Sequence, residues 1–271
     1  MSRPQVMGIV NVTPDSFSDG GRLADLGAAV AHGLMLAEQG ADILDIGGES
    51  TRPGADPVDA DEEIARTAPV IAGLRAAGWA GPISIDTMKP EVARAAVLAG
   101  ATMWNDVSAL GHASDSLETA ASLGCDVVLM HMKGEPRTMQ DAPAYDHVVA
   151  EVADWLAARA GAAMAAGVAR ERIWLDPGIG FGKTADHNLA LTAHLDRLTA
   201  TGFPVLYGAS RKRTIQSIDP TATDAGDRLG GSLALALEAA RQGAGIIRVH
   251  DVRETVQALK TQAAVRDALR V

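Results

Sequence analysis

Aromatic residues and cysteine are scarce in this chain of 271 residues. Phenylalanine, tryptophan and tyrosine together make up 3% of it, so we expect a core of aliphatic side chains and alanine. The single cysteine, Cys125, excludes an intramolecular disulfide and a cysteine-based zinc site. No apolar run approaches the ~18 residues of a membrane span. The first residues lack the apolar core of a signal peptide, so we expect a cytoplasmic protein.

Basic residues are outnumbered by acidic ones. The chain has 24 Lys and Arg against 34 Asp and Glu, a formal net charge of −10. This balance disfavours a broad basic surface for nucleic acid. Hydrophobic residues make up 47% and charged residues 21%, which is the composition of an ordinary folded protein and excludes a disordered or collagen-like chain.

Eight short apolar runs alternate with eight helical stretches. The runs lack strict alternation of polar and apolar residues, as expected for parallel strands buried on both faces. The predicted strands are Met7–Val12, Ile43–Ile46, Ile83–Ile85, Thr102–Trp104, Val127–Met130, Ile173–Leu175, Val205–Tyr207 and Ile246–Val249. The predicted helices cover residues 25–39, 59–77, 90–99, 115–123, 145–166, 186–200, 226–242 and 253–269.

Eight successive strand–helix units, of about 30 residues each, favour one closed (β/α)₈ barrel of the α/β class, a TIM barrel. A doubly wound open sheet is the alternative, but eight units fit closure better. No low-complexity segment, sequence repeat or domain boundary interrupts the chain. We therefore expect residues 1–271 to form a single domain.

Polar residues gather after the apolar runs, at the strand ends where barrel enzymes carry their chemistry. Asp86, Asn105 and Asp176 offer hydrogen-bond acceptors that suit a flat heterocycle with N–H donors. A second group is cationic and suits an anionic small molecule; it contains Arg52, Arg211, Lys212, Arg248 and His250. We predict a substrate with a hydrogen-bonding ring at depth and a phosphate or carboxylate near a cationic rim.

Signals for a metal or a nucleophile are weaker. Mg²⁺ needs few protein ligands because it keeps water and takes substrate phosphates, so the side-chain oxygen of Asn11 could suffice, although the pattern alone does not establish a metal site. No G-x-S-x-G nucleophile elbow is present. The segment Gly178–Gly182 lacks the full dinucleotide-binding fingerprint. Cys125 precedes an apolar run and is expected to be an inert core residue.

Eight segments resemble the motifs of the dihydropteroate synthase family. They are MGIVNVTPDSFSDGG (7–21), DIGGESTRPGA (45–55), SIDT (84–87), NDV (105–107), LMHM (129–132), LDPGIGFGK (175–183), GASRK (208–212) and IRVHDV (247–252). The first two and GASRK are highly specific. The resemblance covers nearly the whole chain, with the motifs in the expected order.

The resemblance implies a pterin-binding (β/α)₈ barrel enzyme of folate biosynthesis. Such enzymes condense 6-hydroxymethyl-7,8-dihydropterin diphosphate with 4-aminobenzoate, giving 7,8-dihydropteroate and diphosphate. Diphosphate departs with the help of Mg²⁺ and the arylamine then attacks. Sulfonamides mimic the aminobenzoate. The family also implies a homodimer built on late helices, here the stretches 186–200, 226–242 and 253–269.

The resemblance also assigns residues to each part of the site. The pterin ring would be held by Asp86, Asn105, Val107, Met130, Asp176 and Lys212. The diphosphate would meet Asn11, Thr51, Arg248 and His250, and Asn11 would take Mg²⁺. The aminobenzoate would lie near Thr51, Arg52, Pro53, Phe181, Ser210 and Lys212. The residues expected to act in catalysis are Asp86, Asp176, Lys212, Arg248 and His250.

Two alternatives compete with this interpretation. A methyltransferase using methyltetrahydrofolate would have a similar barrel and pterin pocket, but would not be expected to carry the 7–21 segment or GASRK. A catalytically silent pterin-binding paralogue should have lost some of the loop or rim residues, and none departs from the family motifs. Trp104 and Tyr207, beside motif residues, look larger than common family choices and could alter packing.

Overall fold

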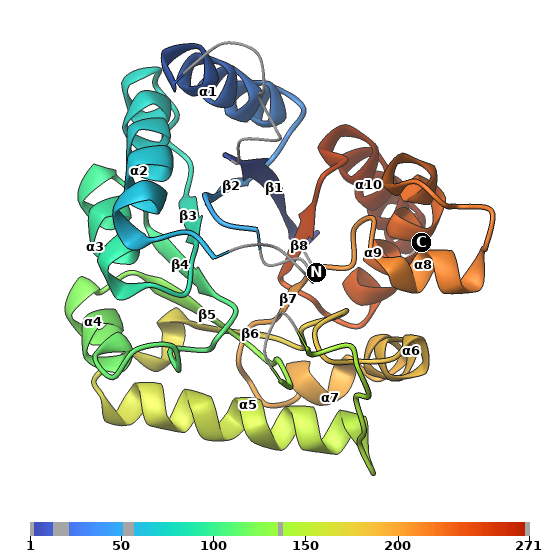
Figure 1. Ribbon diagram of the computed structural model, residues 1–271. Coiled ribbons are helices and arrows are strands. Elements are labelled where there is room, and N and C mark those ends of the chain that lie inside the picture. The colour runs from blue at the N-terminus through green and yellow to red at the C-terminus, as the bar shows by residue number, and fades with distance from the viewer. Residues whose placement is uncertain (1–2, 13–21, 51–56, 135–137, 269–271) are drawn as a thin grey trace.

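Eight parallel strands form the centre of the molecule in a computed structural model of the chain, which describes residues 3–12, 22–50, 57–134 and 138–268. Figure 1 views the strands along the axis that they surround. They are β1 (Gln5–Asn11), β2 (Ile43–Gly47), β3 (Ile83–Asp86), β4 (Met103–Asp106), β5 (Asp126–Met130), β6 (Ile173–Asp176), β7 (Leu206–Tyr207) and β8 (Ile246–Val249). All eight predicted strands are present, and their ends move by at most two residues.

The sheet closes on itself. The strands are hydrogen-bonded in the order β6-β5-β4-β3-β2-β1-β8-β7, and every pairing is parallel. An isolated parallel bridge between Leu175 and Val205 joins the two remaining edges, at β6 and β7. The predicted (β/α)₈ barrel is therefore confirmed, and the open-sheet alternative is wrong.

Helices surround the barrel (Figure 1). They are α1 (Arg22–Glu38), α2 (Ala60–Ala76), α3 (Pro90–Ala99), α4 (Ser116–Leu123), α5 (Val148–Ala165), α6 (Ala185–Ala193), α7 (Asp196–Thr199), α8 (Arg213–Ile218), α9 (Leu229–Arg241) and α10 (Val252–Ala268). The predicted helix 186–200 is two helices, because His194 leaves the helical conformation. Helix α8 was not predicted, because its six residues are too few to show a helical period.

Two hydrophobic clusters bury the strands. The larger one lies between the sheet and the helices. The smaller one fills the barrel interior, and its buried members are Met7, Ile43, Met103, Val128, Leu206 and Ile246. Side chains two positions apart along a strand share a face. The residues two positions beyond Ile43, Met103 and Ile246 therefore also face the interior, nearer the carboxyl ends of the strands.

Trp104 and Tyr207 belong to the outer cluster, not to the barrel interior. Both are fully buried. The indole Nε1 of Trp104 donates to the carbonyl of Thr87 at 2.8 Å, and the Tyr207 hydroxyl lies 2.7 Å from Thr192 Oγ1. Their polar groups are thus satisfied, and these large residues fill space between sheet and helices.

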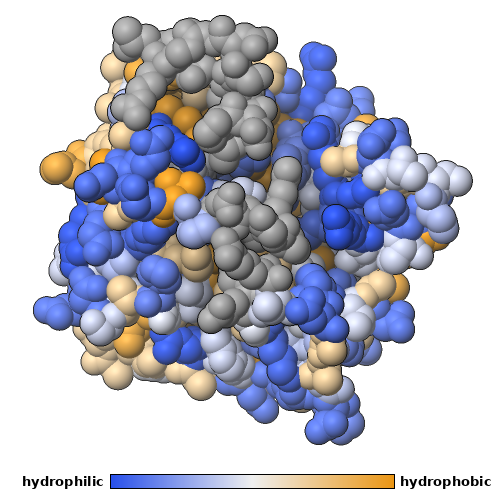
Figure 2. Space-filling model, in the orientation of Figure 1, coloured by the Kyte–Doolittle hydropathy of each residue, from blue (hydrophilic) through white to orange (hydrophobic). Residues whose placement is uncertain are grey.

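The outer surface seen in Figure 2 is largely hydrophilic, with scattered hydrophobic residues. None of the helices in the described ranges combines the length and the hydropathy needed to cross a bilayer. Cys125 is buried as a free thiol, and its burial raises the pKa to about 11. Its place in the core agrees with the prediction, and a raised pKa disfavours the thiolate, which is the reactive form of a cysteine.

Candidate active site

Charged and amide side chains line the carboxyl end of the barrel interior. Asp45, Asn105 and Arg248 lie two residues beyond the apolar interior positions of their own strands. The register pairs Asp86 of β3 with Asn105 of β4, and Asp176 of β6 with Met130 of β5. Strand register alone thus brings these groups to one end of the barrel.

Arg248 forms two ion pairs at the centre of this end. Its Nε lies 2.6 Å from Asp45 Oδ2, and its Nη2 lies 2.7 Å from Asp86 Oδ2. Asp45 is fully buried, and the Arg248 side chain is 21% exposed. Asn105 Nδ2 also approaches Asp45 Oδ2, at 3.4 Å. Side chains from β2, β3, β4 and β8 are therefore linked across the interior.

The second carboxylate oxygens of Asp45 and Asp86 are buried, and the described residues offer them no hydrogen-bond donor. Burial raises the pKa of Asp86, and the Arg248 guanidinium opposes that rise. An unsatisfied buried acceptor needs an explanation, and a ligand with N–H donors would satisfy it.

A lysine and a carboxylate face each other on the other side of the barrel. Asp176 Oδ1 accepts a 2.7 Å hydrogen bond from the backbone N–H of Gly178, and burial raises the pKa of Asp176. Lys212 Nζ donates to the Ile179 carbonyl and lies 4.7 Å from the centre of the Phe181 ring. Burial lowers the pKa of Lys212 to about 8, although the nearby Asp176 charge favours its ammonium form.

Ser210 and His250 contact each other where β7 and β8 end. The Ser210 hydroxyl lies 3.0 Å from His250 Nδ1, and it accepts a 3.2 Å hydrogen bond from the His250 backbone N–H.

Two of the arginines predicted to form a cationic rim are paired with carboxylates. Arg211 adopts a left-handed backbone conformation (φ 59°) and pairs with Asp251 at 2.5 and 3.0 Å. Arg248 lies at depth between Asp45 and Asp86, since its position inside β8 points it into the barrel. Arg52 lies outside the described residues.

The other predicted site residues fall in three places. Val107 and Met130 are buried at the ends of β4 and β5. Asn11 ends β1, and its Oδ1 is 3.9 Å from where a Cβ on Gly47 would lie. Thr51 and Pro53 lie outside the described residues, as does most of the 7–21 segment.

Two groups of residues were not predicted. Asp45 interrupts the apolar run of β2, and this lone charge in a buried strand is a signal that could have found it. Lys89 Nζ lies 2.6 Å from both Glu49 Oε2 and Glu63 Oε2. Glu63 is fully buried in α2, and this network ties the segment after β2 to α2 and to the start of α3.

Comparison with known proteins identifies the family. A model of the pterin binding enzyme family matches residues 7–250. The dihydropteroate synthase of Neisseria meningitidis serogroup B is 49% identical over 270 residues, covering 98% of this chain and 94% of that protein. The chain belongs to the dihydropteroate synthase family.

Solved structures of family members have the same fold. A Xanthomonas albilineans dihydropteroate synthase with 4-aminobenzoic acid superposes with a TM-score of 0.91 at 55% identity, covering 97% of this chain and 93% of that one. The same organism's enzyme in complex with 7,8-dihydropteroate gives a TM-score of 0.88 at 52% identity, covering 97% and 94%. Membership in this family of folate-biosynthesis enzymes agrees with the sequence motifs.

Proposed function

We propose that this chain condenses 6-hydroxymethyl-7,8-dihydropterin diphosphate with 4-aminobenzoate to form 7,8-dihydropteroate. The observation that carries the proposal is the set of acceptors and cations assembled at one end of the barrel, in a chain of the dihydropteroate synthase family. We also propose that residues 1–271 form a single domain and that the protein is cytoplasmic.

The pterin ring is proposed to bind at depth. Asp86, Asn105 and Asp176 accept hydrogen bonds from its ring N–H and amino groups, and Lys212 donates to its acceptors. Val107 and Met130 supply apolar walls. The unsatisfied buried oxygen of Asp86 supports this placement, because a heterocycle with N–H donors would supply the missing hydrogen bond.

The diphosphate is proposed to lie beside Arg248 and His250. Arg248 uses Nε and Nη2 in its ion pairs, which leaves Nη1 for an anionic oxygen. His250 lies at the end of β8, with Nδ1 3.0 Å from Ser210 Oγ, and is the second proposed contact of the diphosphate. Thr51 is a further candidate contact, outside the described residues.

The residues present fit a magnesium ion that takes most of its ligands from water and diphosphate. The described residues contain no cluster of three His, Cys, Asp or Glu side chains that could hold a metal alone. An amide oxygen such as Asn11 Oδ1 is a ligand that Mg²⁺ accepts. When bound, the ion would neutralise charge on the departing diphosphate.

The aminobenzoate is proposed to lie toward the outside of the pterin. Phe181 and Lys212 form one side of this subsite, because the lysine lies over the aromatic ring. Ser210 is close by in sequence and is 8% exposed. Thr51, Arg52 and Pro53 complete the proposed subsite from outside the described residues.

The reaction breaks the C–O bond between the pterin methylene carbon and the diphosphate. The bonding electron pair leaves with the diphosphate, whose charge Arg248 and His250 stabilise. Asp86 and Asp176 favour the cationic character that develops on the electron-rich pterin. The arylamine nitrogen then attacks the methylene carbon and releases a proton to solvent. No strong general base is needed, because an arylamine is already neutral at pH 7.

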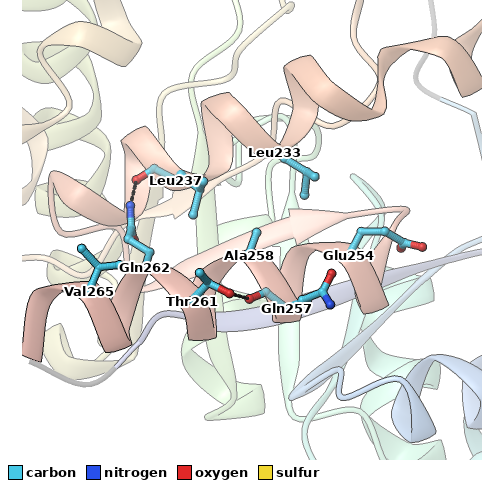
Figure 3. Close-up of a pocket in the computed structure, with 8 residues that line it drawn as sticks. All are labelled: Leu233, Leu237, Glu254, Gln257, Ala258, Thr261, Gln262 and Val265. Carbon is cyan, nitrogen blue, oxygen red and sulfur yellow. Dashed lines mark hydrogen bonds between the residues drawn. The ribbon is translucent and has the colours of Figure 1, made fainter. Parts of the chain in front are cut away.

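A homodimer is proposed on the late helices. A groove of about 560 Å³ runs along α9 and α10 and is lined partly by apolar residues. Figure 3 shows Leu233, Leu237, Ala258 and Val265 along it. Val265 is 60% exposed. Light scattering at micromolar concentration should give twice the chain mass, and Leu237→Arg should shift it to the monomer; a wild-type monomer would contradict the dimer.

Turnover tests the proposed reaction. We expect diphosphate release that requires the dihydropterin diphosphate, 4-aminobenzoate and Mg²⁺ together. Pterin binding without any turnover would favour the silent paralogue. Methyl transfer from methyltetrahydrofolate, without condensation, would favour the methyltransferase.

A further inference from the structure

The segment from Gly178 to Gly182, between β6 and α6, is held by side chains along its whole length. Each of its five successive carbonyls accepts a hydrogen bond from a side chain; the donors, in order, are Lys183, Lys212, Gln140, Lys183 and Tyr145. Lys183 therefore supplies two of the five bonds. We call this segment the β6 loop.

Lys183 is the most deeply placed of these donors. It is 2% exposed. Its Nζ lies 3.0 Å from the Gly178 carbonyl, 2.9 Å from the Phe181 carbonyl, and 3.1 Å from the His131 carbonyl just beyond β5. His131 Nδ1 is a fourth neighbour, at 2.9 Å. One ammonium group thus ties both ends of the β6 loop to the end of β5.

The loop also packs directly against that end of β5. A Cβ added to Gly178 would lie 2.0 Å from the His131 carbonyl oxygen, and one on Gly182 would lie 2.2 Å from that of Lys133. Both glycines have left-handed backbones, with φ of 66° and 62°. The His131 ring packs edge-on against the Trp155 ring, with the two ring centroids 5.0 Å apart. Lys183 therefore joins the loop to a surface that cannot easily move.

The opposite side of the same loop holds the proposed pterin and aminobenzoate groups. The Ile179 carbonyl binds Lys212, the Phe181 ring lies below the Lys212 ammonium, and the Gly178 N–H binds Asp176. A Cβ on Gly180 would lie 3.2 Å from Lys212 Cδ. Any shift of the loop would move both Lys212 and Phe181.

We propose that Lys183 is a positioning residue: by fixing the β6 loop against His131 it sets the orientation of Lys212, Phe181 and Asp176 toward the substrates. Lys183 lies beneath the loop and touches no substrate in this account. The inference rests on the proposed function, which places the pterin and the aminobenzoate at these residues.

Calorimetric titration with 6-hydroxymethyl-7,8-dihydropterin tests the proposal. Lys183→Met keeps the length of the side chain and removes its donors. We expect it to bind the pterin at least tenfold more weakly while circular dichroism shows a folded protein. Lys260→Met, on the exposed face of α10, is the matched control and should bind as the wild type does. Hydrogen exchange of residues 176–183 should be faster in Lys183→Met alone.

A second variant covers the case in which Lys183→Met does not fold. His131→Leu removes one of the four Nζ neighbours and leaves the three carbonyls, so a three- to fivefold weaker affinity is expected. A role in stability alone would lower the melting temperature and leave the affinity of the folded protein unchanged. Affinity within twofold of wild type in a folded Lys183→Met, or in His131→Leu if the former does not fold, overturns the proposal.

Lys212→Met, measured in parallel, separates this proposal from the proposed site. Unchanged pterin affinity in Lys212→Met would show that the site itself is misplaced. Weakened affinity in Lys212→Met, with wild-type affinity in Lys183→Met, would overturn only the positioning role.

Discussion

The two sides of the barrel mouth are built in different ways. On one side Asp45, Asp86 and Arg248 project from strands and pair with one another at 2.6 to 2.7 Å. On the other side Lys212 and Phe181 project from loops: the Ile179 carbonyl accepts a hydrogen bond from Lys212, and the Phe181 carbonyl accepts one from Lys183. The first side consists of close ion pairs, whereas on the second side Lys212 donates to a neutral carbonyl, with the Asp176 charge nearby.

The two sides should contribute differently to protein stability and to ligand binding. Strand side chains are fixed by the register of the barrel, so removing one leaves its buried partners uncompensated. Loop side chains are held by contacts that can be lost without opening the barrel. Changes on the strand side should therefore lower the free energy of unfolding more than changes on the loop side, which should mainly weaken ligand binding.

Arg248→Met should have the largest effect. It leaves Asp45 and Asp86 buried without a cation, which should lower the free energy of unfolding by about 3–5 kcal/mol. Urea denaturation measures this. Lys212→Met, on the loop side, breaks no close ion pair among the described residues and should cost far less. Adding Asp45→Asn to Arg248→Met should restore part of the lost stability, because it removes one of the uncompensated charges. Equal stability of Arg248→Met and Lys212→Met would contradict the difference between the two sides of the barrel mouth.

Asp176→Asn should weaken pterin binding with little effect on folding. The amide oxygen can still accept from the Gly178 N–H, but the charged acceptor is lost. A hydrogen bond to a charged group contributes about 1.5–3 kcal/mol, or roughly a 10- to 150-fold change in affinity. Calorimetry with the pterin, beside a thermal melt, checks both parts. Wild-type affinity in Asp176→Asn and in Asp86→Ala would remove both residues from the pocket.

The barrel was predictable because eight apolar runs that alternate with eight helical stretches leave a strong local pattern. The end of the barrel where the site lies was predictable because polar residues follow each strand. The pairing partners were not: Asp45 lies in β2, which β1 separates from β8 in the sheet, and only the curvature of the barrel brings Asp45 to Arg248. The role of Asp251 beside Arg211 is equally non-local, because their contact joins residues 40 positions apart.

Gly182, on the loop side, has a matched control in Gly124, which ends α4 before the amino end of β5. Gly182 and Gly124 have φ of 62° and 59°. A Cβ meets the Lys133 carbonyl oxygen at 2.2 Å in the first case and nothing within 4 Å in the second. Gly124→Ala should therefore cost only backbone strain, about 1 kcal/mol. Gly182→Ala should lower the free energy of unfolding by roughly 2–4 kcal/mol, because overpacking adds to that strain. Of the two variants, only Gly182→Ala should weaken pterin binding. Equal losses of stability in urea denaturation would contradict the close packing of Gly182.

The free energy of unfolding should rise with pH because of Lys183, a residue of the loop side. Burial lowers the pKa of Lys183 to about 7 from its ordinary 10.5, so the unfolded chain holds more protons than the folded one between those values. The free energy of unfolding then increases with pH in this window. Lys183→Met should reduce the slope by up to about 1.4 kcal/mol per pH unit, as measured by denaturation from pH 7 to 9. An identical slope in the variant would show that Lys183 does not titrate there.

Tyr207→Phe should have the smallest effect on stability, and it tests whether the active site extends beyond the barrel interior. It removes one buried hydrogen bond to Thr192, which contributes about 0.5–1.5 kcal/mol. Thr192 Oγ1 keeps its bond to the Asn188 carbonyl. Turnover should be unchanged, since Tyr207 packs between sheet and helices. A large loss of turnover without a loss of stability would extend the site into the outer cluster.

The most direct test of the two-sided mouth is a crystal structure of this chain with 6-hydroxymethyl-7,8-dihydropterin diphosphate and Mg²⁺. The account predicts the pterin ring within hydrogen-bond distance of Asp86, Asn105 and Asp176, with Lys212 still on the Ile179 carbonyl or turned to the ring, and the diphosphate beside Arg248 and His250. A ring bound elsewhere, or an Arg248 that leaves both Asp45 and Asp86 to reach the ligand, would contradict it.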